Sequence, residues 1–270
     1  MSEKTTSFLV RPGKRVRLDR WPTDDGRATP KAKDRGDQEL QKLKVRLDRL
    51  QELLYADHTH AVLIVLQGMD TAGKDGTIRR VFEGVNPQGV RVESFKVPSD
   101  EERAHDFLWR VHARTPAKGQ LTVFNRSHYE DVLITRVHDL IPRATWERRY
   151  DEINEFERTL TDEGTIILKF YLHLSRGEQR RRLQERLDDP AKHWKFREGD
   201  VTERKFWKAY MAAYEDAITA TSTSWAPWCI VPADRKWYRD LVVCRRIVET
   251  LEGLKMRFPS LPPEFHHARI

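Results

Sequence analysis

The sequence predicts an α/β fold in which a five-stranded parallel sheet lies between two layers of helices. Short apolar segments of strand length alternate with longer amphipathic segments between residues 61 and 251, and this alternation is typical of parallel sheets covered by helices on both faces. The first short segment, AVLIVL at residues 61–66, is continuously apolar, as expected for a strand buried on both faces. The pattern contains no internal repeat, so we expect a single domain.

We expect an arm before this domain and a tail after it. Residues 1–35 are rich in Lys, Arg, Asp, Gly and Pro and lack periodicity. We interpret them as a basic, extended or partly ordered arm whose charges are solvated. The domain is expected to span residues 36–258, and residues 259–270 would form the tail. Leucines at helical spacing in residues 37–56 predict a helix that packs on the core.

The other elements follow in order along the chain. Further strands are expected at residues 90–96, 121–124, 166–174 and 228–231. A serine followed three residues later by a glutamate is the capping box that begins many helices, and it occurs at Ser99–Glu102 and Ser175–Glu178. The first of these helices is expected to continue through Val111. Amphipathic segments predict further helices at residues 146–160, 206–217 and 241–251.

Composition and charge narrow the function classes. The chain has 270 residues, a formal net charge of +7 and a pI near 9.4, which favours a polyanionic partner. No apolar run approaches the roughly 18 residues of a membrane span, and the N-terminus lacks the apolar core of a signal peptide. Cys229 and Cys244 lie in apolar surroundings, as expected for buried reduced thiols. We therefore expect a cytoplasmic protein without a membrane partner.

A glycine-bracketed loop after the first strand predicts a phosphate-binding site. The spacing from Gly68 to Gly73 and Lys74 fits the P-loop pattern G-x-x-x-x-G-K, in which backbone N–H groups, the helix start and the lysine attract an anion. Asp75 stands where that pattern has Ser or Thr. Asp70 would repel phosphate unless a divalent cation lay between them, and Mg²⁺ is commonly held by carboxylates plus phosphate oxygens. The alternative is an ordinary turn between a strand and a helix.

A polar segment after the third strand is expected to face the same crevice. Residues 125–131 read NRSHYED, and ligand groups in open α/β sheets gather at the carboxyl ends of the strands. Arg126 would supply positive charge there. His128 is expected to pack or to form a hydrogen bond rather than to become a phosphohistidine.

A basic segment at about residues 175–205 predicts a lid. Residues 176–208 hold eleven Lys or Arg against seven Asp or Glu, with a proline and a glycine between them, which suits a mobile element that closes over phosphates. A solvated, salt-bridged helix fits the charges equally well. Trp194 and Phe196 are expected to pack beneath the lid rather than to stack on a base.

Several separated motifs together resemble the polyphosphate kinase 2 family. They are GMDTAGKDGTIRR, NPQGVRVESFKVPS, FNRSHYEDV, ILKFYLHLS, RLDDPAKHWKF and APWCIVPADRKWYRDLVV. The resemblance covers nearly the whole chain from about residue 37. It implies a thymidylate-kinase-like P-loop fold with a helical lid, and a reversible, Mg²⁺-dependent transfer of a phosphoryl group from inorganic polyphosphate to nucleotides. Mn²⁺ is the alternative ion.

The resemblance also implies roles for individual residues. Asp70 and Lys74 match the aspartate and lysine of the family's phosphate loop, and Arg126 belongs to its second, Walker B-like motif. Asn125 stands where many relatives have Asp, which leaves Asp131 or Glu130 to help Asp70 hold the metal. The predicted catalytic residues are Asp70, Lys74, Arg126 and Asp131, and the predicted metal ligands are Asp70 and Asp131.

The predicted binding residues belong to the P-loop, the Walker B-like segment and the lid. Arg186 and Lys192 fall in the lid motif expected to hold polyphosphate. The run at residues 128–131 resembles the single-domain subgroup that accepts both nucleoside mono- and diphosphates, so Glu130 is the predicted specificity residue. The complete set for polyphosphate and nucleotide is Gly68, Met69, Thr71, Ala72, Gly73, Asp75, Gly76, Thr77, Arg79, Arg80, Asn125, Glu130, Arg136, Arg182, Arg186, Lys192 and Lys195.

The predicted function is transfer of a phosphoryl group from polyphosphate to AMP and ADP, giving ADP and ATP, with guanine nucleotides as further candidates. Such a transfer needs alignment, metal and positive charge, because the attacking phosphate oxygen is already ionised. Two alternatives are an ATP-dependent nucleotide kinase of the same fold and a basic phosphate- or nucleic-acid-binding protein without catalysis. The aromatic residues fall mainly at core periodicities, so we expect no nucleic-acid partner. We expect a homo-oligomer, a dimer or a tetramer.

Overall fold

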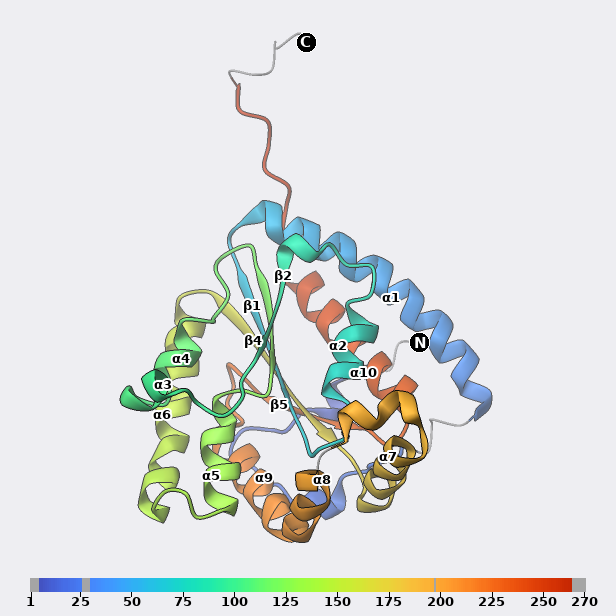
Figure 1. Ribbon diagram of the computed structural model, residues 1–270. Helices are drawn as coiled ribbons and strands as arrows, with labels where there is room; N and C mark the ends of the chain where they lie inside the picture. The colour runs from blue at the N-terminus through green and yellow to red at the C-terminus, as the bar shows by residue number, and fades with distance from the viewer. Residues whose placement is uncertain (1–4, 26–29, 197, 264–270) are drawn as a thin grey trace.

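Five parallel strands form one sheet in the computed structural model, which describes residues 5–25, 30–196 and 198–263 (Figure 1). The strands are β1 (Ala61–Gln67), β2 (Val90–Ser94), β3 (Leu121–Asn125), β4 (Thr165–His173) and β5 (Trp228–Pro232). Their spatial order is β2-β3-β1-β4-β5, and every pairing is parallel. The predicted fold class and the five predicted strands are confirmed.

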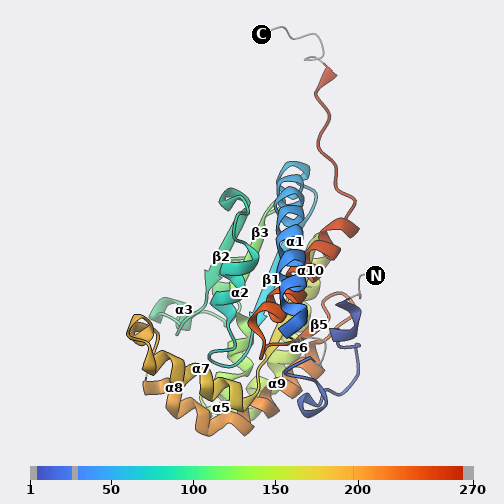
Figure 2. The same cartoon turned by 90° about the vertical axis from the view of Figure 1, so that its right-hand side faces the viewer.

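Helices cover both faces of this sheet. One layer contains α1 (Pro30–Asp57), α2 (Lys74–Val81) and α10 (Lys236–Gly253). The opposite layer contains α6 (Arg143–Asp162) and α9 (Trp207–Thr221), together with the short α3 (Asp100–Ala104), α4 (Trp109–His112) and α5 (Ile134–Val137). Figure 2 shows α1 and α10 side by side, and these two helices are in extensive contact.

The central strand β1 is buried on both faces. Val62 and Ile64 pack in the core beneath α1 and α10, whereas Leu63 and Val65 pack in the core beneath α6 and α9. Successive side chains of a strand point to opposite faces, so an apolar run without polar alternation is what this position requires. The expected buried thiols, Cys229 and Cys244, lie in the first core and are free.

Helix α1 begins earlier than the leucine pattern predicted. It starts at Pro30, where the first turn of a helix tolerates proline, so the predicted boundary at residue 35 lies inside it. Gly36 is in this added portion, and a Cβ there would overlap the ring of Trp237 on α10. The glycine therefore permits the close approach of α1 and α10.

The N-terminal arm packs against the body of the protein. Phe8, Val10, Val16 and Leu18 are buried, while the basic residues from Arg11 to Arg20 are exposed as expected. The arm contains the short 3-10 helices η1 (Thr5–Phe8) and η2 (Leu18–Arg20). It also reaches the sheet, because Leu9 forms an antiparallel bridge with Cys229 and the N–H of Val10 donates to Trp228 O at 2.8 Å.

Two local predictions were wrong. The capping box at Ser99 and Glu102 forms, but its helix ends at Ala104 because His105 is extended, and α4 starts separately after Asp106 accepts a hydrogen bond from the N–H of Leu108. At Ser175 only half of the second box forms. The serine hydroxyl accepts from Glu178 N, but the glutamate carboxylate binds arginines instead of closing the box.

The segment after β4 is helical, as the lid prediction required. It contains α7 (Arg176–Asp188), η5 (Pro190–Lys195), α8 (Glu198–Glu203) and η6 (Arg204–Phe206). In Figure 1 it lies at the end of the sheet where β1 and β4 terminate. Among the described helices, none is long and apolar enough to cross a membrane.

Candidate active site

The candidate active site lies at the carboxyl end of the sheet. The P-loop (residues 68–74) follows β1, and the Walker B-like segment (residues 125–131) begins at the last residue of β3. These strands are neighbours, and the N–H of Arg126 donates to Leu66 O at 3.2 Å. The parallel topology therefore brings the two predicted segments to one edge of the sheet.

The backbone of the P-loop turns sharply before α2. Thr71 and Gly73 have positive φ angles of 66° and 101°, a conformation that glycine adopts readily and other residues rarely. A Cβ at Gly73 would overlap the guanidinium of Arg239 from α10. Gly73 is therefore required both for the turn and for this close contact.

Lys74, the first residue of α2, lies inside the loop. Its Nζ donates to Gly68 O at 2.6 Å, so the ammonium closes the loop on itself. Burial, followed by the positive charge of Arg126, lowers the pKa of Lys74. A bound phosphate would oppose both effects and stabilise the charged ammonium.

A chain of charged groups joins the P-loop to the Walker B-like segment. Arg126 donates to the Asp70 carboxylate at 3.0 Å, and its second terminal nitrogen lies 3.9 Å from Glu130. Asn125 donates to the carboxylate of Asp75. The predicted residues Asp70, Asp75, Asn125, Arg126 and Glu130 thus lie together in the structure, as one phosphate site would require.

Glu130 is held by a buried residue that the sequence reading missed. With the amide of Gln67 oriented so that both of its polar atoms are satisfied, Nε2 donates to Glu130 at 3.0 Å and Oε1 accepts from Ser127 N at 3.1 Å. Gln67 is the last residue of β1 and is fully buried. It fixes the Walker B-like segment against the strand that carries the P-loop.

A buried ionic network on β4 and α6 supports the Walker B-like segment. Lys169 on β4 donates to Glu157 on α6 at 2.5 Å and to the Tyr129 hydroxyl at 2.9 Å. The Tyr129 hydroxyl and the His128 ring also lie within hydrogen-bond reach of Glu157, at 2.8 and 3.3 Å. His128 therefore packs and hydrogen-bonds, as predicted. The one available signal for the network was a lysine inside an apolar strand.

Asp131 faces away from this chain of contacts. Its carboxylate lies 3.5 Å from Arg149 and 3.8 Å from Arg110. Burial raises its pKa to about 6, although the two arginines oppose that shift. The structure thus pairs Asp131 with arginines, and the catalytic and metal-binding roles predicted for it stay predictions.

Two predicted phosphate-binding residues use their side chains for contacts within the protein. Arg182 is 5% exposed and donates to the carbonyl oxygens of Thr71 and Ala72. The hydroxyl of Thr77 is buried and donates to Asp240 at 3.0 Å. Both side chains thus contact the protein itself, and the binding roles predicted for them stay predictions.

The lid cations mostly contact the lid itself. Arg186 donates to Lys195 O and to Asp200, both at 3.0 Å, and Lys192 pairs with Asp189 at 2.8 Å. Trp194 is 77% exposed, so the prediction that it packs beneath the lid was wrong.

The predicted binding residue Arg136 lies outside the lid, on α5, and pairs with Asp216 at 2.8 Å.

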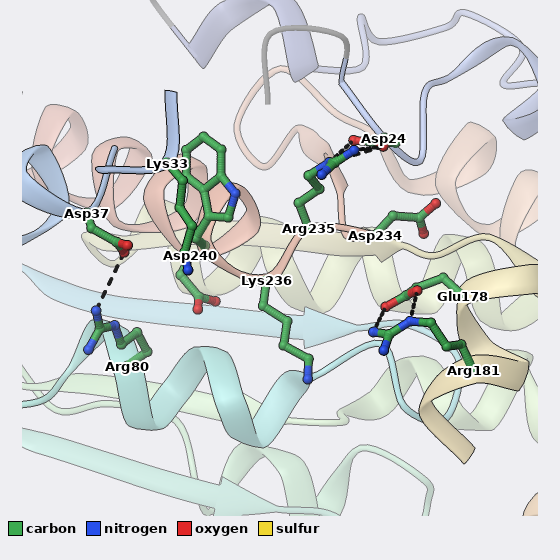
Figure 3. A pocket seen from close by; sticks show the side chains of 11 residues that line it. Asp24, Lys33, Asp37, Arg80, Glu178, Arg181, Asp234, Arg235, Lys236 and Asp240 are labelled. Carbon is green, nitrogen blue, oxygen red and sulfur yellow. Dashed lines mark hydrogen bonds and ion pairs between the residues drawn. The ribbon is translucent and has the colours of Figure 1, made fainter. Parts of the chain in front are cut away.

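A polar cavity of about 730 Å³ lies on the α1 and α10 side of the P-loop helix. Figure 3 shows acidic and basic side chains alternating around it. Arg80 of α2 is a predicted binding residue in this set, and it also lies 3.6 Å from Asp37. The lining residues are Asp24, Lys33, Asp37, Arg80, Glu178, Arg181, Asp234, Arg235, Lys236, Trp237 and Asp240.

A divalent cation fits beside Asp70 only if phosphate oxygens of the substrate supply further ligands. The Asp70 side chain is 28% exposed, so it is partly accessible from solvent. Within the described residues, no three His, Cys, Asp or Glu side chains gather as a metal site. Mg²⁺ commonly binds one or two carboxylates plus phosphate oxygens and water, which matches a single aspartate beside a phosphate loop.

The strand, glycine loop and helix with Lys74 define this protein as a P-loop phosphate-binding protein of the α/β class. A profile of the family described as Polyphosphate kinase 2 (PPK2) matches residues 30–259. The chain belongs to the polyphosphate kinase 2 family.

Individual relatives agree with this assignment over most of the chain. An AMP/ADP-polyphosphate phosphotransferase of Meiothermus ruber is 56% identical, over 94% of this chain and 95% of the relative. An ADP-polyphosphate phosphotransferase of Rhodopseudomonas palustris is 46% identical, over 97% and 95%. The crystal structure of Polyphosphate Kinase 2 from Arthrobacter aurescens TC1 is similar with a TM-score of 0.92, at 43% identity and over 96% and 93% of the two chains.

Proposed function

We propose that this protein transfers the terminal phosphoryl group of inorganic polyphosphate to a phosphate oxygen of AMP or ADP, and that the reaction is reversible. The observation that carries the proposal is the contact chain from Asp70 through Arg126 to Glu130. It places a carboxylate, a guanidinium and a second carboxylate beside the P-loop of a polyphosphate kinase 2 family member. The polyphosphate chain would become one phosphate shorter in each turnover.

The residues of this chain have separable roles in the proposal. Lys74 and Arg126 would neutralise charge on the transferring group, and the P-loop N–H groups would orient it. Because the acceptor phosphate oxygen is already ionised, no side chain is needed to remove a proton. Arg186, Lys192 and Lys195 would exchange their contacts within the lid for contacts with the polyphosphate chain.

Asp70 would hold the metal. When bound, Mg²⁺ or Mn²⁺ would supply positive charge between the donor and acceptor phosphates. The ion pair with Arg126 orients the Asp70 carboxylate while the phosphates are absent. Asp131 remains the second proposed ligand. Its present pairing with Arg149 would have to break.

We further propose that Glu130 determines which acceptor is used. Gln67 holds its carboxylate close to Arg126, so Glu130 would set the distance between the acceptor and the P-loop. The name of the Meiothermus ruber relative includes AMP and ADP, whereas that of the Rhodopseudomonas palustris relative includes ADP alone. The similarity to the first favours use of both acceptors.

Purified protein incubated with Mg²⁺, long-chain polyphosphate and either AMP or ADP tests the proposal. We expect ATP from ADP, and ADP from AMP. A Glu130→Asn variant should lose transfer to AMP by about tenfold more than transfer to ADP, since one lost charged contact corresponds to about this factor. If the wild-type protein forms product from ADP but not from AMP, Glu130 does not have the proposed role in the use of AMP. Transfer only from ATP would replace the proposal with an ordinary nucleotide kinase.

A further inference from the structure

Five carbonyl oxygens of the P-loop, those of residues 68 to 72, accept hydrogen bonds. Lys74 donates to Gly68 O and Ala72 N donates to Met69 O. Gln179 from α7 donates to Asp70 O at 3.1 Å. Arg182 donates to Thr71 O and Ala72 O at 2.9 and 3.2 Å, and Arg239 donates to Ala72 O at 2.9 Å. Five successive carbonyl groups are therefore fixed in direction.

Arg182 uses its whole guanidinium in this arrangement. Besides the two P-loop carbonyls, it donates to Ala233 O at 2.7 Å, to Asp234 O at 3.0 Å and to the Glu178 carboxylate at 2.7 Å. An arginine has five N–H donors in a rigid fork, and all five are satisfied here. This guanidinium joins the P-loop to the end of β5 and has no donor left for a ligand.

Arg239 approaches the same loop from α10. Its Nε donates to Asp240 at 2.8 Å, and the Asp240 carboxylate also accepts from the Thr77 hydroxyl. Both Arg239 and Asp240 are buried. The missing Cβ of Gly73 leaves the space that the Arg239 guanidinium occupies, so glycine and arginine form one fitted contact.

Fixing the carbonyl groups also fixes the N–H groups. In a planar trans peptide, the C=O of one residue and the N–H of the next point in opposite directions. The bond from Gln179 to Asp70 O therefore aims the Thr71 N–H group away from the buried side chains, and the bonds from Arg182 and Arg239 to Ala72 O do the same for the Gly73 N–H group. Neither of these N–H groups donates to an acceptor within the described residues. Converging free N–H groups of this kind bind anions.

We propose that Arg182 and Arg239, the carbonyl clamp, are positioning residues that aim the Gly73 N–H group at the donor phosphate. The clamp acts from behind the loop and touches no substrate. The proposal rests on the proposed function, in which this loop binds polyphosphate, and it assigns a role to Arg239 that its place near the end of the chain does not suggest.

Binding of inorganic tripolyphosphate, measured by calorimetry without nucleotide, tests the clamp. Arg239→Lys and Arg182→Lys keep the charge but remove the planar fork that spans several acceptors. The matched control is Arg245→Lys, on α10 but paired with Glu39. We expect about tenfold weaker tripolyphosphate binding in each clamp variant, a similar rise in KM for polyphosphate, and wild-type values in the control.

Circular dichroism separates this effect from loss of fold. If a lysine variant does not fold, Thr77→Val removes only the hydroxyl that orients Asp240, and tripolyphosphate binding should weaken by about two- to threefold. Folded clamp variants with wild-type tripolyphosphate affinity and KM would overturn the proposal. Transfer to ADP tests the proposed function, whereas binding of tripolyphosphate tests the clamp, so either can fail while the other stands.

Discussion

The P-loop and the lid both carry the charges of a phosphate site, but they are held in different ways. The P-loop backbone is bound by buried side chains from α7 and α10. Beyond these buried residues of α7, the later part of the lid is different: Lys192 and Lys195 are exposed, and Arg186 contacts neighbouring lid residues. The P-loop is fixed by the rest of the fold, whereas the later part of the lid is fixed mainly by itself.

The difference indicates a division of labour. A site whose dipoles are oriented before the ligand arrives spends no free energy on reorganisation at the moment of reaction. The later part of the lid has exposed cations and no buried residue in η5, so it should open and close at low cost. The P-loop should therefore determine the rate of transfer, and the lid should mainly determine how tightly the polyphosphate chain is held.

Removing the charge from the fixed region should have the largest effect. Lys74→Met deletes the ammonium next to the transferring group, and loss of one such group commonly lowers kcat by about 10²–10³. Steady-state turnover of polyphosphate and ADP measures the change. Lys14→Met, in the exposed part of the arm, is the control. Turnover of the Lys74 variant within about threefold of the wild type would remove the lysine from the mechanism.

Asp70→Asn should lower kcat by about 10², because it removes the proposed metal-binding carboxylate and leaves the shape of the loop. Tripolyphosphate binding without metal should be retained, since the asparagine carries no charge to repel the anion. Titration of activity with Mg²⁺ checks the assignment, and a higher Mg²⁺ requirement is expected. An unchanged Mg²⁺ requirement would mean that another group holds the ion.

Arg186→Met should affect binding more than rate. The variant lacks one lid cation that would contact polyphosphate. KM for polyphosphate should therefore rise by about tenfold, while kcat should change by less than about threefold. Arg143→Met, in an exposed ion pair on α6, serves as a control of equal charge change. A fall in kcat as large as that of the Lys74 variant would contradict the proposed difference between the P-loop and the lid.

The smallest effect should come from pH. Burial lowers the pKa of His173, at the end of β4 near the fixed region. The unfolded chain then binds more protons below the usual value of about 6.5, so this contribution to stability is present above that pH and is lost as pH falls. Tm should drop by a few degrees between pH 7 and 5.

The variant His173→Gln tests the source of this pH dependence. Glutamine can still donate to Leu18 O, as His173 Nε2 does at 3.1 Å in one tautomer, but it does not titrate. The drop in Tm should therefore be smaller in the variant. An equal drop in both proteins would assign the pH dependence to other groups, of which buried His128 is one.

Local patterns predicted the strands and the position of the phosphate site. The continuous apolar run of β1 and the G-x-x-x-x-G-K spacing are readable within about fifteen residues, and parallel pairing then brings residues 125–131 beside the P-loop. Contacts between distant segments were not readable. From sequence, Arg182 and Thr77 were predicted to contact the ligand. Gln67, Lys169 and Arg239 carried no sign of their contacts with Glu130, Glu157 and Ala72, which are distant in the chain.

The N-terminal arm has a consequence for how this protein behaves in concentrated solution. A sheet edge with unpaired N–H and C=O groups is a template for association with other chains. Leu9 and Val10 occupy that edge at β5, while the opposite edge strand, β2, is only five residues long and carries the charged pair Arg91 and Glu93. Trimming the arm during expression would uncover the β5 edge and promote aggregation without touching any residue of the active site.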